Sequence, residues 1–156
     1  MSTPLLPNAE LVAKQWLLAA VSGLTGKVST TLPDSPWTDN EFVQIMAVGG
    51  TPDPDVPMFH PVVTINVFAG KPGSRKPPWG QAFQLAMRIV MATYTKRWAP
   101  DPAVELTGFP ANYGRAIVGS VLPVSDIKKL PSDPSQYAAY TVDLQFNWAP
   151  ASVVIA

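Results

Sequence analysis

The sequence predicts an α+β fold, in which two helices pack on one face of an antiparallel or mixed sheet of about four strands. Two stretches repeat apolar residues at helical spacing. Segments rich in Val, Ile and Thr separate these stretches and are typical of strands. A late segment alternates strictly between apolar and polar residues, as a strand does when only one face of its sheet is covered.

The helices are expected at Ala9–Ser22 and over a longer stretch whose apolar positions run from Trp79 to Trp98. Asn8 precedes the first stretch and is a favourable N-cap. Pro78 stands at the start of the second, where proline is tolerated, and Pro100 prevents its continuation.

The strand candidates are Lys27–Leu32, Phe42–Val48, Val62–Ala69, Ala116–Val124 and Tyr140–Trp148. Phe42–Val48 and Val62–Ala69 are apolar on both faces, which predicts inner strands that pair antiparallel to each other. Gly49 and Gly50 are expected to end the first of them.

Alternation in the last candidate places its apolar side chains against the helices; these are Tyr140, Val142, Leu144 and Phe146. The connections Ala99–Tyr113 and Ser125–Gln136 are expected to be irregular. The loops Thr51–Pro61 and Gly70–Pro78 carry few apolar residues, so we expect them to be mobile and available for contacts.

Composition narrows the classes of function. The 156 residues, here taken as one domain (1–156), carry 11 basic and 11 acidic side chains, and this balance argues against a broad basic nucleic-acid-binding face. Only 14% of the residues are charged, which leaves weakly solvated surface that suits contacts between subunits. The simpler alternative to subunit contacts is a surface that is merely uncharged and rich in proline, since the chain has 18 prolines.

Targeting segments are not expected. Met1–Pro7 lacks a basic segment followed by an apolar run, and no stretch reaches the roughly 18 apolar residues of a membrane span. A cytoplasm-like environment, with no membrane partner, is the expectation.

The residues of catalytic chemistry do not form a recognisable pattern. Cysteine is absent, and no serine-hydrolase, zinc-protease, phosphate-loop or EF-hand motif occurs. The single histidine, His60, is interpreted as a loop or strand-edge residue. Neither a catalytic residue nor a cofactor or metal is therefore expected.

Two charged clusters are candidates for an interface or a lumen. Lys71, Arg75 and Lys76 form a basic loop that could meet phosphate or a neighbour's acidic loop, and a solvated loop is the alternative. Asp53 and Asp55 could bind a cation, but two carboxylates without further oxygen ligands make a weak site, and solvated turn chemistry explains them more simply. Four tryptophans (Trp16, Trp79, Trp98 and Trp148) fall on predicted buried faces, so core packing is preferred to ligand stacking.

Several segments together resemble a known family. They are a strand ending Met46-Ala-Val-Gly-Gly50, the strand Val63-Thr-Ile-Asn-Val-Phe-Ala69, the helix Gln81–Val90 and the alternating strand Tyr140–Trp148. In this order they resemble the tail-terminator and head–tail joining proteins of long-tailed bacteriophages, including minor tail proteins of actinobacterial phages. The likeness spans about Leu11 to Trp148.

The resemblance implies a structural virion protein, assembled in the host cytoplasm and without catalysis. It implies a homo-oligomeric ring, commonly a hexamer, that contacts the tail tube protein on one face and the head-completion or connector protein on the other, with DNA passing through the lumen. The extra prolines and the Ala99–Tyr113 insertion depart from the family's pattern. A small-molecule or peptide-binding module is the alternative function, and a small enzyme is a further one.

Overall fold

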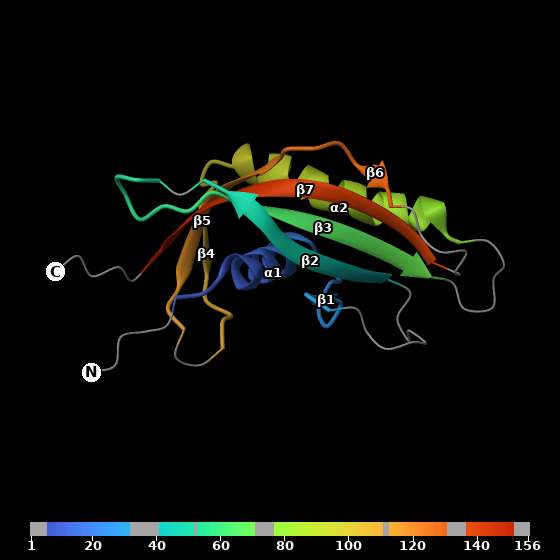
Figure 1. The fold of residues 1–156 in the computed structure, drawn as a ribbon, viewed down its shortest axis with the longest axis horizontal. Helices are drawn as coiled ribbons and strands as arrows, with labels where there is room; N and C mark the ends of the chain where they lie inside the picture. Colours follow the sequence, from blue (N-terminus) through green and yellow to red (C-terminus); the bar gives the residue numbers. More distant parts are fainter. Residues whose placement is uncertain are drawn as a thin grey trace.

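The computed structural model describes residues 6–31, 41–51, 53–70, 77–110, 113–130 and 137–151 (Figure 1). Two helices and seven strands make up this part of the chain. In chain order they are α1 (Ala9–Ala20), β1 (Val28–Ser29), β2 (Glu41–Gly50), β3 (Pro61–Gly70), α2 (Trp79–Arg97), β4 (Val104–Leu106), β5 (Ala116–Pro123), β6 (Lys128–Lys129) and β7 (Tyr137–Pro150).

The strands form one mixed sheet in the order β1-β2-β3-β7-β5-β4, and β6 pairs with β7 beside this path. β1 and β2 are parallel, and the other pairs are antiparallel. The long strands β2, β3 and β7 bend together, so the sheet curls into a half-barrel (Figure 1).

This architecture corrects the predicted fold. The prediction of about four strands with two helices on one face is wrong. The described sheet has seven strands and curls, and the fold is mostly strand. The two helices contact different but overlapping sets of strands: α1 lies mainly against β2, β3 and β4, and α2 mainly against β7, β5 and β3. β4 and β6 fall in connections expected to be irregular, since strands of two or three residues show no periodicity.

Both predicted helices form. The side chain of Asn8 accepts a hydrogen bond from the Leu11 backbone N–H at 2.8 Å, as expected of an N-cap. In α2, the buried hydroxyl of Thr93 donates to the Val90 carbonyl oxygen at 2.6 Å, so this polar side chain is satisfied inside the core. Lys96 and Arg97 occupy the last turn, where positive charge suits the helix dipole.

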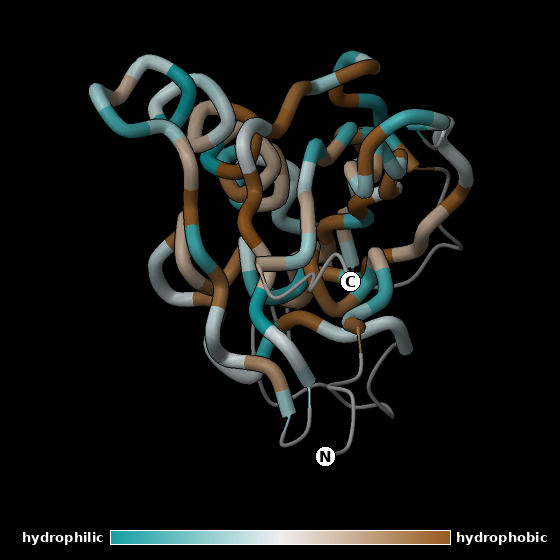
Figure 2. The backbone as a smooth tube through the Cα atoms, turned by 90° about the vertical axis from the view of Figure 1, so that its left-hand side faces the viewer, coloured by the Kyte–Doolittle hydropathy of each residue, from teal (hydrophilic) through white to brown (hydrophobic). Residues whose placement is uncertain are grey.

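The expected buried face of β7 is confirmed. Phe146 is fully buried, and its ring meets the Trp16 ring of α1 edge-on at 5.7 Å. Tyr140 makes a similar contact with Trp79 of α2 at 5.7 Å. Hydrophobic stretches accordingly run through the middle of the fold, with more hydrophilic stretches among the peripheral loops (Figure 2).

Three further expectations change in the structure. β2 is an inner strand only in part, as described below. Gly49 and Gly50 do not interrupt the pairing of this strand: both pair with β3 after a bulge between Ala47 and Gly49, and β2 ends at Gly50. Trp98 is not in the core: it follows the last residue of α2 and is 74% exposed.

Candidate protein interaction surface

Among the described residues, the far half of β2 forms an open edge of the sheet. β1 pairs only with Val43 and Gln44, and beyond them no described residue pairs with the outer edge of β2. Residues 46–50 are all exposed, and the side chains of Met46 and Val48 are 48% and 54% exposed. An apolar strand with free backbone groups is a ready template for pairing with another chain.

A groove continues the line of β1 beside this edge. It has a volume of about 310 Å³ and lies between α1, the end of β1 and β2. Leu11 and Lys14 contribute from α1, Ser29 and Thr30 from the β1 segment, and Ile45 from β2. An incoming strand could therefore extend the sheet where β1 stops and place side chains against α1.

Several exposed apolar residues belong to segments that meet at this end of the molecule (Figure 1). Those of the adjoining segments are Leu6, Met46, Val48, Val56, Met58 and Phe59. They come from the residues before α1, from the end of β2 and from the loop that leads to β3. Apolar side chains concentrated on one surface indicate a contact site, whereas single ones need no explanation.

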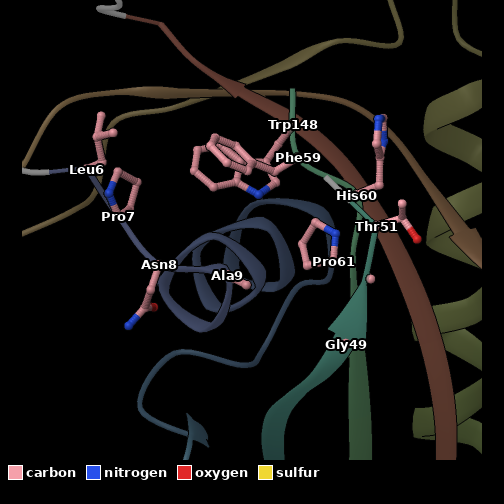
Figure 3. Close-up of a pocket in the computed structure, with 11 residues that line it drawn as sticks. Leu6, Pro7, Asn8, Ala9, Gly49, Thr51, Phe59, His60, Pro61 and Trp148 are labelled. Carbon is pink, nitrogen blue, oxygen red and sulfur yellow. The ribbon is translucent and has the colours of Figure 1, made fainter. Parts of the chain in front are cut away.

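A pocket of about 340 Å³ opens among these segments (Figure 3). Its lining residues are Leu6, Pro7, Asn8, Ala9, Gly49, Gly50, Thr51, Phe59, His60, Pro61 and Trp148. None of them is an acidic residue, a lysine or an arginine. The rings of Phe59 and Trp148 lie against each other with their centroids 4.9 Å apart, and form one wall.

Backbone hydrogen bonds hold the wall formed by Phe59 and Trp148 in place. Phe59 and Trp148 exchange both backbone hydrogen bonds, at 2.8 and 3.0 Å. The loop before β3 is thereby attached to β7, which corrects the expectation that Thr51–Pro61 lacks an apolar anchor. Phe59 supplies that anchor.

A chain of polar contacts supports the pocket from the outer face of the sheet. Asn147 donates to the Ser120 hydroxyl at 2.8 Å, and its side-chain oxygen lies 2.6 Å from Nδ1 of His60. Since this oxygen can only accept, His60 Nδ1 is the donor. Nε2 of His60 lies 4.0 Å from the Asp53 carboxylate.

The structure describes two of the five predicted interface residues, Asp53 and Asp55. Lys71, Arg75 and Lys76 lie outside the described residues, so their expected contacts stay a prediction. Asp53 accepts hydrogen bonds from the backbone N–H groups of Asp55 and Val56 at 2.9 and 3.3 Å, which is turn chemistry. Within the described ranges, no group of three or more acidic, histidine or cysteine side chains could hold a metal ion.

The sequence did not single out Met46, Val48 or the indole of Trp148 as candidates for a site. A signal for the first two was present: β2 is apolar on both faces, a pattern that fits either burial or an interface. For Trp148, alternation correctly predicts a buried ring but cannot indicate whether the ring nitrogen has a partner.

Comparison with known proteins identifies no family: no protein-family model matches the chain, and no curated protein matches it significantly. Among the helices described, none is long and apolar enough to cross a membrane.

Proposed function

We propose that this chain is a ring-forming structural subunit of a virion, which caps the tail tube of a long-tailed phage and joins it to the head connector. The open apolar edge of β2 is the observation that supports ring formation. The phage assignment rests on the sequence resemblance, as do the hexameric state, the tube and connector partners and the passage of DNA. No catalytic role is proposed.

Rings need two different surfaces that match each other around a rotation axis. The edge of β2 supplies one such surface, because strand addition satisfies its free backbone groups. The adjoining apolar side chains would add buried area toward the 1,000 Å² or so that a specific interface requires. In this proposal the basic loop Lys71–Lys76 adjusts register, since exposed ion pairs contribute only about 0.2–1 kcal/mol each.

A peptide-binding module is the second candidate function, and the apolar pocket beside Trp148 favours it. An enzyme has less support. In the described structure the Ser120 hydroxyl is separated from His60 by Asn147, so these two side chains do not form a nucleophile and base in direct contact.

Lysine substitutions at two methionines test whether the edge of β2 takes part in assembly. Met46 of β2 and Met91 of α2 are almost equally exposed, at 48% and 46%. Lysine on a strand edge opposes pairing with another chain. Met46→Lys should therefore raise the concentration needed for assembly by on the order of tenfold or more, because a charge would be buried at the interface. Met91→Lys should leave assembly unchanged.

Native mass spectrometry over a concentration series, with circular dichroism to verify folding, measures this effect. Wild-type protein should reach one discrete oligomer. A wild-type chain that stays monomeric throughout, or equal assembly of both lysine variants, would refute the proposal.

A further inference from the structure

Among the described residues, the indole N–H of Trp148 is a buried donor without an acceptor. Trp148 is only 4% exposed, and its Nε1 atom has no hydrogen-bond partner among the described residues. Buried polar groups in folded proteins are nearly always paired, so an unpaired one requires an explanation. Figure 3 shows this nitrogen on the side of the ring that faces the space between Pro61 and the start of α1.

The pocket around this donor selects its ligand by chemistry. Leu6, Pro7, Pro61 and the Phe59 ring offer apolar contact, and the described lining residues include no acidic residue, lysine or arginine. Nδ1 of His60 is already engaged by Asn147. A matching ligand is uncharged, fills the pocket with an aliphatic group, and presents an acceptor oxygen to Trp148 Nε1.

The open edge of β2 leads into this pocket. Gly49 and Gly50, which end that edge, and Thr51, which follows them, all line the pocket. An extended chain that pairs with β2 would therefore arrive with backbone carbonyl oxygens and alternating side chains, which are the two groups that the pocket requires. The paired Phe59 and Trp148 form the wall in advance, which reduces the entropy cost of binding.

We propose that this pocket binds an uncharged, extended, aliphatic segment of another protein chain. One aliphatic side chain of the segment fills the pocket, and a backbone carbonyl oxygen accepts a hydrogen bond from Trp148 Nε1. The approach along β2 rests on the proposed function, whereas the pocket itself can bind whether or not the chain forms rings.

A peptide titration tests the site on the full chain. The probe is the capped pentapeptide threonyl-valyl-leucyl-valyl-threonine, and its control has lysine in place of leucine. Trp148→Phe removes the donor and keeps an aromatic ring, while Trp79→Phe is the matched control at an indole that packs on Tyr140. Leu6→Glu is a second variant, because Leu6 is 53% exposed and can carry a charge without disturbing the core.

Calorimetry should show that the leucine peptide binds wild type and Trp79→Phe equally. Trp148→Phe should bind about fivefold more weakly, as expected for the loss of one neutral hydrogen bond. Leu6→Glu should also weaken binding, and the lysine peptide should bind least. The indole proton resonance of Trp148 should move downfield as the leucine peptide is added.

Absence of binding, equal binding of both peptides, or an unmoved Trp148 resonance would overturn the proposal. Its failure is distinguishable from failure of the proposed function. Rings without peptide binding would refute this site alone, while peptide binding by a permanent monomer would refute the ring and leave the site standing.

Discussion

Gly50 occupies a position where a side chain does not fit. Its φ is +131°, and a Cβ atom there would press on the His60 carbonyl oxygen and lie 2.7 Å from Cα of Pro61. Gly49 has a similar φ of +153°, but an added Cβ would meet nothing within 4 Å. A side chain at either glycine would strain the backbone, but only at Gly50 would it also clash with neighbouring atoms.

Gly49→Ala should therefore lower the free energy of unfolding by about 1–3 kcal/mol, as is typical of one strained residue. Gly50→Ala should lower it by at least about 1 kcal/mol more, because the backbone at His60 and Pro61 must also move. Urea unfolding of the two variants measures the difference. Equal destabilisation would show that the strand end and the loop are not packed as described.

Individual side chains show how far the sequence could predict the structure. Strict alternation predicted the buried side of β7 correctly, since a strand has only two faces. Helical spacing misplaced Trp98, because the residue lies just past the end of α2 and packs on Tyr94, with ring centroids 5.5 Å apart. The helical spacing of apolar residues continues past the end of the helix, so the spacing does not show where the helix ends.

At the scale of the element, β2 serves two roles along its length. Val43 is buried between β1 and β3, whereas Met46 and Val48 lie on the open edge. The same both-sided apolar pattern predicted an inner strand throughout, because composition does not distinguish burial in the core from burial by a partner. The strand and its antiparallel pairing with β3 were predictable; its open edge was not.

β7 links distant parts of the chain through its outer polar face. Asn147 bridges β5 and the loop before β3, through Ser120 and His60. Gln145 lies two residues earlier on the same face and is similarly half-buried. It makes no side-chain hydrogen bond with the described residues, so it is a natural control.

Asn147→Ala should cost about 1–3 kcal/mol of stability, because His60 Nδ1 and the Ser120 hydroxyl both lose a partner. Gln145→Ala should stay within about 0.5 kcal/mol of wild type. Chemical denaturation of both variants measures this difference. Equal effects would show that the polar chain does not hold the loop to β7.

At the scale of the whole molecule, the curl of the sheet depends on contacts that no local pattern reveals. β1, β4 and β6 contain two, three and two residues, and each is defined by its pairing with a longer strand. Sequence periodicity could predict the long elements but not these additions, so the predicted sheet was too small. The interaction surface likewise arises only when the ends of β2 and β7 and the start of α1 come together.

The central claim is that the open edge of β2 becomes buried between subunits. Hydrogen exchange of backbone amides, measured on the assembled wild-type chain and on the monomeric Met46→Lys variant, tests it most directly. We expect exchange at residues 46–50 to slow by on the order of tenfold or more on assembly, because strand pairing protects free amides, while amides around Met91 stay unchanged. Unchanged exchange at residues 46–50 in an assembled ring, or protection confined to the region of Met91 and Trp98, would contradict the claim.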